Sequence, residues 1–261
     1  MRIALKLALA ATAAMLAIGA AQAQERTIKI GTEGAYPPFN NLTADGKLEG
    51  FDIDIGNALC EQMNVKCEWV TQDWDGIIPA LQAGKFDAIL ASMSITEERK
   101  KQVDFSEKYY NTPPSIAAPK DSDIKGVTKE DLAGKTIGVQ GGTTHFNYSE
   151  KTYTDSEIKP YPTAHEMHAD MANGRLDAIN DDIIVTQEFL DSPEGQACCK
   201  LIGTITPVVE IHGPGAGIAV RKGDKLADEF SAAIKAIRAN GKYKEINDKY
   251  FKFDAYGAEG S

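Results

Sequence analysis

Arg99 has the chemistry to bind a small anion, and it stands in the charged run EERKK. Thr96 is a typical helix N-cap, and it would place Arg99 at the third helical position. There the guanidinium and the helix N-terminus could act together on one carboxylate, which a guanidinium binds through two parallel hydrogen bonds. Composition alone favours a simpler interpretation, in which Arg99 is an exposed residue of a charged helix.

Further polar side chains follow two similar stretches of the chain. Residues 81–90 read LQAGKFDAIL and residues 171–180 read MANGRLDAIN. The first stretch leads to Ser92 and Ser94, and the second leads to the acidic pair Asp181-Asp182. An acidic pair after a strand is often a turn or a helix cap, so the pair alone does not identify a site.

The similar stretches predict the elements that position these side chains. Gly84 and Gly174 are natural left-handed ends of a helix, and a basic residue follows each of them. IGTEG (30–34) and IGVQG (137–141) are a second pair of similar segments, each with a glycine after a short apolar run. We therefore predict two similar α/β lobes whose strand ends face each other across a cleft, and we interpret the repeated residues as scaffold.

Strand-like runs alternate with helical runs along the chain, which favours parallel βαβ units and an α/β fold. We expect strands at 28–31, 67–70 and 87–91, and helices at 52–63, 76–83, 225–240 and 243–250. Two apolar segments marked by proline or glycine, 109–119 and 207–220, could carry the chain between the lobes. The C-terminal helices would then return to the first lobe.

Residues 1–23 are typical of a secretory signal peptide. Arg2 and Lys6 precede an apolar run from Leu7 to Ala20, and residues 21–23 (AQA) offer a small-residue cleavage site. The mature chain would be soluble and exported to the periplasm. Removing the two basic residues changes the formal charge from −10 to −12 and leaves no basic cluster, so nucleic acid and anionic membranes are poor partners.

Export would let the four cysteines pair, with three connectivities open. Cys60 ends a predicted helix and Cys67 begins a predicted strand, so we expect a short bridge between neighbouring elements. Cys198 and Cys199 are adjacent. A vicinal disulfide needs a distorted peptide unit, and two free or separately capped thiols are an equal alternative.

The whole mature chain resembles the periplasmic polar amino-acid-binding proteins of ABC importers, closest to the lysine/arginine/ornithine, arginine and histidine binders. The motifs that carry the resemblance are GTEGAYPPF (31–39), GFDIDIGNALC (50–60), SMSITEER (92–99), DFSEKYY (104–110), GTTH (142–145) and GRLDAI (174–179). The resemblance implies a type II periplasmic binding protein fold. Each lobe would have a central, mainly parallel sheet flanked by helices, and two strands would form the hinge.

The same resemblance implies the division of the chain. Lobe 1 would comprise residues 24–111 and 213–261, and lobe 2 would comprise residues 115–207. The hinge would lie near 112–114 and 208–212.

The resemblance further implies a site for a free α-amino acid. Residues Ser92, Met93, Ser94 and Arg99 match the carboxylate-binding segment of the family. Thr144 would touch the same carboxylate from lobe 2. A zwitterion also needs an anion for its ammonium group.

Asp182 stands at the offset after GRLDA where the family carries its ammonium-binding aspartate, with Asp181 as the alternative. Glu33, Tyr36 and Trp74 would surround the distal end of the ligand. Two aromatic faces can sandwich an alkyl chain or a guanidinium, and a carboxylate beyond them would pair with a terminal cation. The implied ligand is therefore arginine, ornithine or lysine.

Several positions leave the ligand open. His145 matches the arginine-binding branch, although a lone histidine is as often a packing residue. Ala91 stands where several relatives carry a serine, and Glu33 where lysine/arginine/ornithine binders have a shorter aspartate. Histidine, glutamine or an arginine-derived opine remain alternatives. We interpret Asp52 as a helix-start or supporting residue rather than a ligand contact.

An enzyme is the main rival, because some periplasmic dehydratases resemble this fold and use a cleft carboxylate as general acid or base. Glu33 would be the candidate. Arg99, Asp182 and Ser94 already account for a whole zwitterion, which favours a binding protein with no catalytic residue and no cofactor.

Two other readings are less favoured. The run HEMH at 165–168 is not the HExxH zinc motif, so a solvated helix face is favoured over a metal site. A receptor sensor domain would need a downstream membrane span. We expect instead a monomer that delivers its ligand to a membrane permease.

Overall fold

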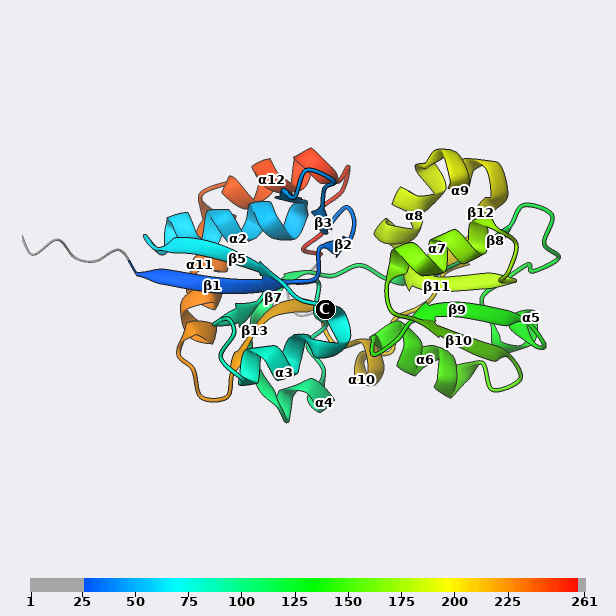
Figure 1. Ribbon diagram of the computed structural model, residues 1–261, viewed down its shortest axis with the longest axis horizontal. Helices are drawn as coiled ribbons and strands as arrows, with labels where there is room; N and C mark the ends of the chain where they lie inside the picture. The colour runs from blue at the N-terminus through cyan, green and yellow to red at the C-terminus, as the bar shows by residue number, and fades with distance from the viewer. Residues whose placement is uncertain (1–25, 258–261) are drawn as a thin grey trace, which may run out of the picture.

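The computed structural model describes residues 26–257, so the predicted signal peptide at 1–23 lies outside the described residues. The strands of the described part form two five-stranded sheets and one three-stranded sheet. Figure 1 shows the two large sheets in separate halves of the molecule, with helices above and below each sheet. The first and the last of the described residues share one half, and the middle of the chain forms the other.

The first half is built on the sheet with strand order β5-β1-β6-β13-β7. Its strands are β1 (Thr27–Thr32), β5 (Lys66–Thr71), β6 (Ala88–Ile89), β7 (Val103–Tyr110) and β13 (Ala216–Arg221). Its helices are α2 (Phe51–Gln62), α3 (Ile77–Gln82), α4 (Glu97–Lys100), α11 (Leu226–Ala239) and α12 (Lys242–Tyr250). Strand β1 runs parallel to β5 and β6, whereas β13 runs antiparallel to β6 and β7.

The predicted helices and strands of the first half are confirmed to within a few residues at their ends. The expected helix at 76–83 is preceded by one turn of 3-10 helix, Trp74–Gly76. Helix α2 buries Phe51, Ile55 and Leu59, which lie four residues apart on one face. Helices α11 and α12 both pack against α2, so the C-terminal helices do return to the first half.

The second half is built on the sheet with strand order β10-β9-β11-β8-β12. Its strands are β8 (Pro114–Pro119), β9 (Thr136–Gln140), β10 (Glu157–Tyr161), β11 (Ala178–Asp182) and β12 (Cys199–Thr204). Its helices are α5 (Lys129–Leu132), α6 (Thr144–Thr152), α7 (Ala164–Ala172), α8 (Ile183–Asp191) and α9 (Pro193–Cys198). In residues 26–257 no helix is both long enough and apolar enough to cross a membrane.

The two large sheets repeat one arrangement. In the second half, β9 runs parallel to β10 and β11, and β8 runs antiparallel to β11 and β12. Each sheet therefore has three parallel strands, and the strand that comes first in the sequence, β1 or β9, lies between the other two. The fourth strand, β13 or β8, is antiparallel to both of its neighbours. The predicted α/β class with two similar, mainly parallel sheets is confirmed.

The repeated stretches do the same structural work in both halves. Gly84 and Gly174 have φ of 75° and 71°, a left-handed conformation that glycine adopts freely, and each ends a helix. Asp87 accepts from the backbone N–H of Lys29 at 3.0 Å, and Asp177 accepts from that of Thr136 at 2.8 Å. Each aspartate thus fastens the strand after the helix to its parallel neighbour. The interpretation of the repeat as scaffold is confirmed.

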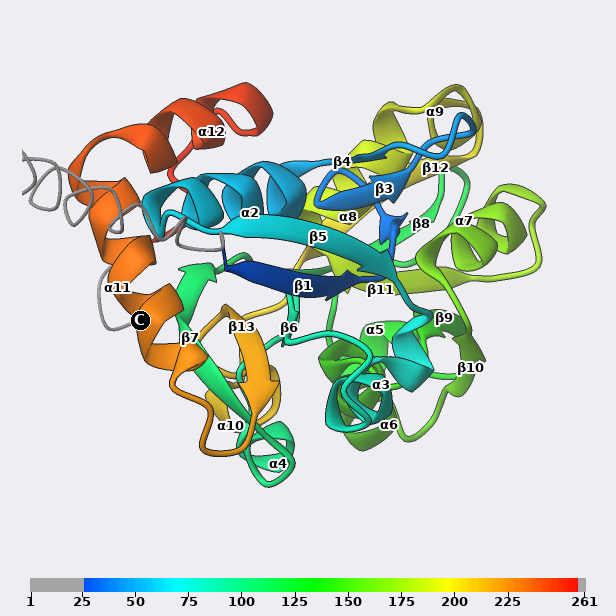
Figure 2. The same ribbon diagram turned by 60° about the vertical axis from the view of Figure 1, so that its left-hand side comes forward.

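The small sheet joins β2 (Ala35–Tyr36), β3 (Asn40–Leu42) and β4 (Leu48–Glu49) between β1 and α2. Strand β2 packs against α7 of the second half, as Figure 2 also shows. Tyr36 is therefore carried to the boundary between the halves.

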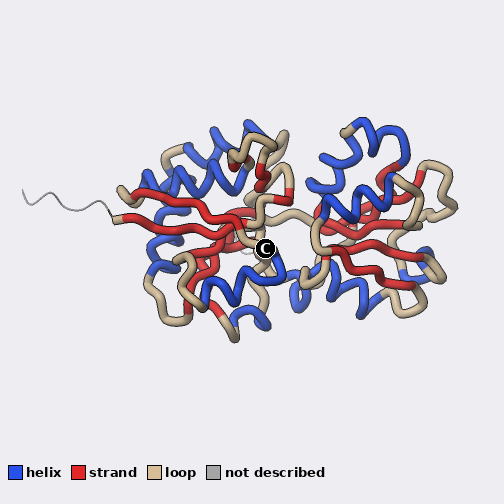
Figure 3. Tube along the Cα trace, in the orientation of Figure 1, coloured by secondary structure: helices blue, strands red, loops and turns tan. Residues whose placement is uncertain are grey.

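The chain passes between the large sheets twice, at 111–113 and at 205–215 (Figure 3). The second passage is not extended throughout, because it contains the short helix α10, Val209–His212. His212 stabilises this turn, since its Nδ1 accepts from the backbone N–H of Val208 at 3.0 Å. The expected pair of strands is thus one extended passage and one passage with a helical turn.

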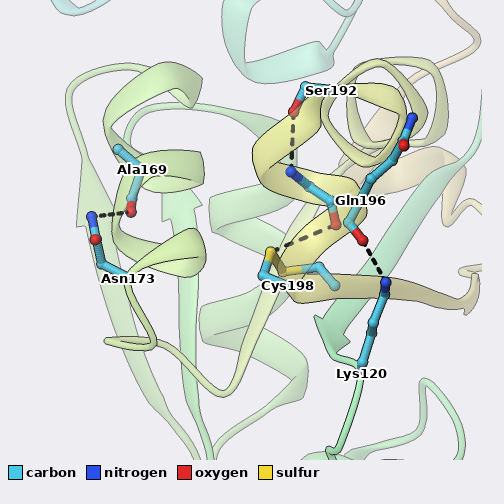
Figure 4. The surroundings of a disulfide bond; sticks show 8 residues. Lys120, Ala169, Asn173, Ser192, Gln196 and Cys198 are labelled. Carbon is cyan, nitrogen blue, oxygen red and sulfur yellow. Dashed lines mark hydrogen bonds between the residues drawn. A yellow bond between two sulfur atoms is a disulfide. The ribbon is translucent and has the colours of Figure 1, made fainter.

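The four cysteines form two disulfides. Cys60 and Cys67 join the last turn of α2 to β5, with Cα atoms 6.0 Å apart. Cys198 and Cys199 are bonded to each other where α9 changes into β12 (Figure 4). Of the two alternatives for this pair, the structure has the vicinal disulfide. Neither bond links the two halves.

Candidate functional site

Arg99 lies at the boundary between the halves, at the third position of α4. Its backbone N–H donates to the Thr96 hydroxyl at 3.2 Å, so the predicted N-cap is confirmed. The guanidinium donates to the carbonyl of Ser94 at 3.0 Å and, across the boundary, to that of Gly142 at 3.1 Å. It also lies over the Trp74 ring, 5.2 Å from its centroid. Burial lowers the pKa of Arg99 to about 10, which leaves it cationic at neutral pH.

Ser92 is held in place by two residues of the first half. Its φ of 54° is left-handed, a conformation that costs about 1–3 kcal/mol outside glycine. The Ser92 hydroxyl donates to Asp52 at 3.0 Å, and its N–H donates to the Tyr109 hydroxyl at 3.0 Å. Tyr109 in turn donates to Asp52 at 2.8 Å. Asp52 is fully buried in the first turn of α2, so it supports the site, as interpreted from the sequence.

Met93 lies apart from the polar residues around it. Its side chain is fully buried in the apolar cluster of the first half, together with Ile77 and Phe86. It borders a separate opening of about 380 Å³ beside Trp74 and Arg99. The sequence pattern could not separate Met93 from its neighbours, because Ser92 and Ser94 point to the opposite side of the segment.

The second half contributes the start of α6 to the boundary. Thr143 caps this helix by accepting from the N–H of Phe146 at 3.1 Å, and Thr144 is its first residue. The Thr144 hydroxyl lies 3.5 Å from that of Ser94. His145 follows in the same turn, and burial lowers its pKa to about 3, so the ring is neutral.

The acidic pair at the end of β11 points in two directions. Asp182 caps α8, accepting from the N–H of Ile184 at 2.8 Å, and it also accepts from the hydroxyl of Thr112 in the first passage. Burial raises the pKa of Asp182 to about 6. Asp181 instead accepts from the Tyr36 hydroxyl at 2.6 Å. The cap that the sequence offered as an alternative is therefore real, and Asp182 also faces the space between the halves.

Glu33 and Gln140 meet across the boundary. Gln140 Nε2 donates to Glu33 Oε1 at 2.7 Å and to the carbonyl of Pro162 at 3.1 Å. Burial raises the pKa of Glu33 to about 7, partly opposed by this hydrogen bond. Gln140 was missed from the sequence. The similarity between IGTEG and IGVQG could have identified it, because Gln140 occupies the position of Glu33.

Two adjoining cavities lie between the halves. The first has a volume of about 320 Å³, its open part included, and is lined by Glu33, Tyr36, Trp74, Ser92, Ser94, Arg99, Gln140, Thr144 and His145, among others. The second, about 430 Å³, shares five of these residues and adds Asp182, Thr112 and His212 on the side of the passages. The fold thus brings all of the predicted ligand residues except Met93 to one cleft.

The cleft is charged at separate places. Its cation is Arg99 from the first half, and its acidic groups are Glu33 at the far end and Asp182 beside the passages. Hydroxyl groups of Ser92, Ser94 and Thr144 lie between them. Such an arrangement can hold a small molecule that carries a carboxylate and more than one cationic group.

Comparison with known proteins agrees with this geometry. Residues 28–253 match the model of the bacterial extracellular solute-binding proteins, family 3. The L-arginine-binding protein of Pseudomonas aeruginosa is 48% identical over 240 residues, which cover 90% of this chain and 92% of that protein. The lysine/arginine/ornithine-binding periplasmic protein of Escherichia coli is 37% identical over 88% of this chain and 90% of its own length.

Solved structures are similar over the same region. An ancestral arginine-binding protein bound to arginine superposes with a TM-score of 0.79 at 38% identity, covering 86% of this chain and 98% of its own. An ancestral amino acid-binding protein described as a precursor of cyclohexadienyl dehydratase superposes with a TM-score of 0.76 at 33% identity, over 87% and 95%. The relatives named above are binding proteins rather than enzymes.

Proposed function

Because the chain belongs to the bacterial extracellular solute-binding proteins of family 3, we propose that it captures a basic L-amino acid between its halves and delivers it to an ABC importer. The observation that carries this proposal is the placement of Arg99 and Asp182 on opposite halves of one cleft. A free amino acid has the complementary charges, and only a closed cleft can satisfy both of them.

The carboxylate of the ligand would bind Arg99. Two of the five guanidinium N–H groups donate to the carbonyls of Ser94 and Gly142, which fixes the plane of the group and leaves three donors. Thr144, at the start of α6, would add a donor from the second half. A hydrogen bond to a charged group contributes about 1.5–3 kcal/mol, so a few such bonds support micromolar affinity, about −8 kcal/mol.

The ammonium group would bind Asp182. Its carboxylate is fixed by the N–H of Ile184 and the hydroxyl of Thr112, so it is oriented before a ligand arrives. A cation would compensate the burial that raises the pKa of this group.

The side chain of the ligand would extend toward Glu33, between Tyr36 and Trp74. Burial in the closed cleft disfavours the ionised form of Glu33, and a guanidinium or ammonium beside it would restore that form. An uncharged side chain such as that of glutamine could not do this. Two similar proteins are named for binding arginine, or lysine, arginine and ornithine. These names also favour a ligand with a cationic side chain.

The division into lobes follows from the two passages. We infer that lobe 1 comprises 24–111 and 213–261, that lobe 2 comprises 115–207, and that the chain bends near 112–114 and 208–212. Residues 1–23 would be removed on export to the periplasm, where the protein would act as a monomer and dock its closed form on the membrane permease.

A binding panel tests the ligand class. Isothermal titration with arginine, ornithine, lysine, histidine, glutamine and glutamate should give micromolar or tighter binding for basic amino acids. Glu33→Gln should reduce the preference for arginine over glutamine by about tenfold or more, because it removes a charge-assisted hydrogen bond. Glu157→Gln, at an exposed site on β10, is the control and should leave the preference unchanged. Binding of glutamate or an apolar amino acid alone would contradict the proposal.

Enzyme activity is the second candidate, since Glu33 has a pKa near neutrality and a related ancestral protein precedes cyclohexadienyl dehydratase. We infer that the chain is not an enzyme, because Arg99, Asp182 and Glu33 are all engaged by a basic zwitterion. Incubation with prephenate-like acids should give no aromatic product. Turnover that Glu33→Gln abolishes would reverse this inference.

A further inference from the structure

Asp181 has no role in holding the ligand as proposed above, yet it makes a direct contact between the halves. Successive residues of a strand point to opposite faces, so Asp181 and Asp182 of β11 face different surroundings. Asp181 is 2% exposed. Its Oδ1 accepts from the Tyr36 hydroxyl at 2.6 Å and from the backbone N–H of Asp182 at 2.8 Å.

Tyr36 is the side chain that links this contact to the cleft. It lies on β2 of the first half, lines both cavities, and packs its ring parallel to that of Phe39 at 6.0 Å. Its partner Asp181 is 145 residues away and belongs to the second half. This hydrogen bond therefore forms only when the halves approach each other.

The Tyr36 hydroxyl is an important hydrogen-bond donor to Asp181, because the other described side chains around this carboxyl group do not donate to it. The Nε2 atoms of His145 and His168 lie 3.9 Å from its two oxygens, beyond hydrogen-bond range. Burial lowers the pKa of both imidazoles to about 3, so they face the carboxylate as neutral rings. The other charges nearby are those of Glu33 and Asp182, which repel it.

The remaining oxygen of Asp181 is also without a donor among residues 26–257. Burial raises the pKa of Asp181 to about 7, so its ionised form depends strongly on each donor, because losing a partner exposes the full cost of its desolvation. Tyr36 stays a donor, since burial and the neighbouring carboxylates raise the pKa of its phenol well above its usual value.

We propose that Asp181 is a positioning residue that fastens Tyr36 across the closed cleft and so sets how long the ligand is retained. This rests on the proposed function. The side chain of a bound amino acid would fix the Tyr36 ring, and the fixed ring would present its hydroxyl to Asp181. Occupancy of the cleft and closure of the halves are then coupled through one tyrosine.

A double-mutant cycle tests this coupling. Tyr36→Phe and Asp181→Asn, singly and together, are titrated with arginine, and ligand release is followed by stopped-flow fluorescence of Trp74, which lines the cleft. Each single variant should bind about tenfold more weakly or worse, mainly through faster release. The double variant should bind no more weakly than the weaker single one, because both changes remove the same bond.

Tyr250→Phe is a matched control. The Tyr250 hydroxyl donates to Asp54 at 2.8 Å, a tyrosine–carboxylate bond within the first half, and its loss should leave the release rate unchanged. If Asp181→Asn folds poorly, Asp181→Ala replaces it, with melting temperatures recorded for every variant. A merely structural role would lower the melting temperature and leave the release rate alone.

Fold-changes that multiply in the double variant, or an unchanged release rate in either single variant, would overturn the proposal. The double-mutant cycle is measured with whichever amino acid of the panel binds the wild-type protein. A preference for another ligand would contradict the proposed function, and the same cycle with that ligand would still test the role of Asp181.

Discussion

Arg99 is the residue on which the carboxylate end depends. Its guanidinium is fixed by two carbonyls and by the face of Trp74, and only a planar fork can keep these contacts while binding a carboxylate through two further bonds. Lysine keeps the charge but not this geometry.

We therefore predict that Arg99→Lys weakens binding of the ligand by about tenfold to a hundredfold, a loss of about 1.5–3 kcal/mol. Isothermal titration measures the change. Arg175→Lys is the control, since Arg175 pairs with Asp170 at a site 65% exposed on the second half. Equal affinities for the wild type and Arg99→Lys would exclude Arg99 as the carboxylate partner.

His168 predicts a pH effect on stability. Burial among apolar atoms, including the stacked Phe189 ring at 4.4 Å, lowers its pKa from 6.5 to about 3. Between these values the unfolded chain binds the proton and the native protein does not, so this contribution to stability is lost as the pH falls below 6.5. Asp181 cannot reverse the shift, because burial raises its own pKa to about 7 and it is largely protonated in this range.

His168→Phe should remove this contribution. The free energies of unfolding of the wild type and the variant should stay a constant distance apart above pH 6.5. At lower pH the wild type should lose about 1.4 kcal/mol per pH unit relative to the variant. Urea titrations at pH 7 and pH 5 give the difference. Parallel curves would show that His168 has the same pKa in the native protein as in the unfolded chain.

At this scale the sequence was most informative where residue type and spacing coincide. The N-cap Thr96 was enough to place Arg99 in its helix. Gln140 was also predictable, because it stands in IGVQG where Glu33 stands in IGTEG. The contact between Tyr36 and Asp181 could not be predicted, because it joins residues 145 positions apart and depends on how closely two halves approach.

At the scale of elements, the second passage between the sheets makes a very close backbone contact with the first half. Gly213 ends α10 with φ of 72°, and a Cβ atom there would lie 2.0 Å from the carbonyl oxygen of Ile95. Gly223 has a similar φ of 76° with nothing within 4 Å. Gly213 also has ψ of −177°, a conformation that is essentially restricted to glycine, so a substitution there combines a conformational cost with the clash.

Gly223→Ala should cost about 1 kcal/mol, the penalty of the left-handed conformation. Gly213→Ala should cost at least about 2 kcal/mol more, since the passage must move away from the Ile95 carbonyl. Denaturant unfolding of the two variants measures both values. Similar losses would mean that the second passage shifts freely.

The long elements were predictable because their signals are local. Helix α2 follows from its buried face, and the ends at Gly84 and Gly174 follow from glycine itself. Helix α10 was missed because a turn of four residues carries no periodic pattern, and its support comes from the His212 ring.

At the scale of the whole molecule, polar contacts join the halves around the cleft. They include the contacts between Tyr36 and Asp181, Gln140 and Glu33, Arg99 and Gly142, and Ser94 and Thr144. Each uses a residue that lines the cleft, so the groups that would touch the ligand also hold the halves together. The ligand can then shift the equilibrium toward closure through its higher affinity for the closed form.

A crystal structure of the protein with L-arginine tests this account most directly. We predict a ligand enclosed by both halves, with its carboxylate within hydrogen-bond distance of the Arg99 guanidinium, its ammonium on Asp182, and its guanidinium beside Glu33. Arginine bound in the opposite direction, bound to one half alone, or lying away from Arg99 and Asp182 would contradict the account.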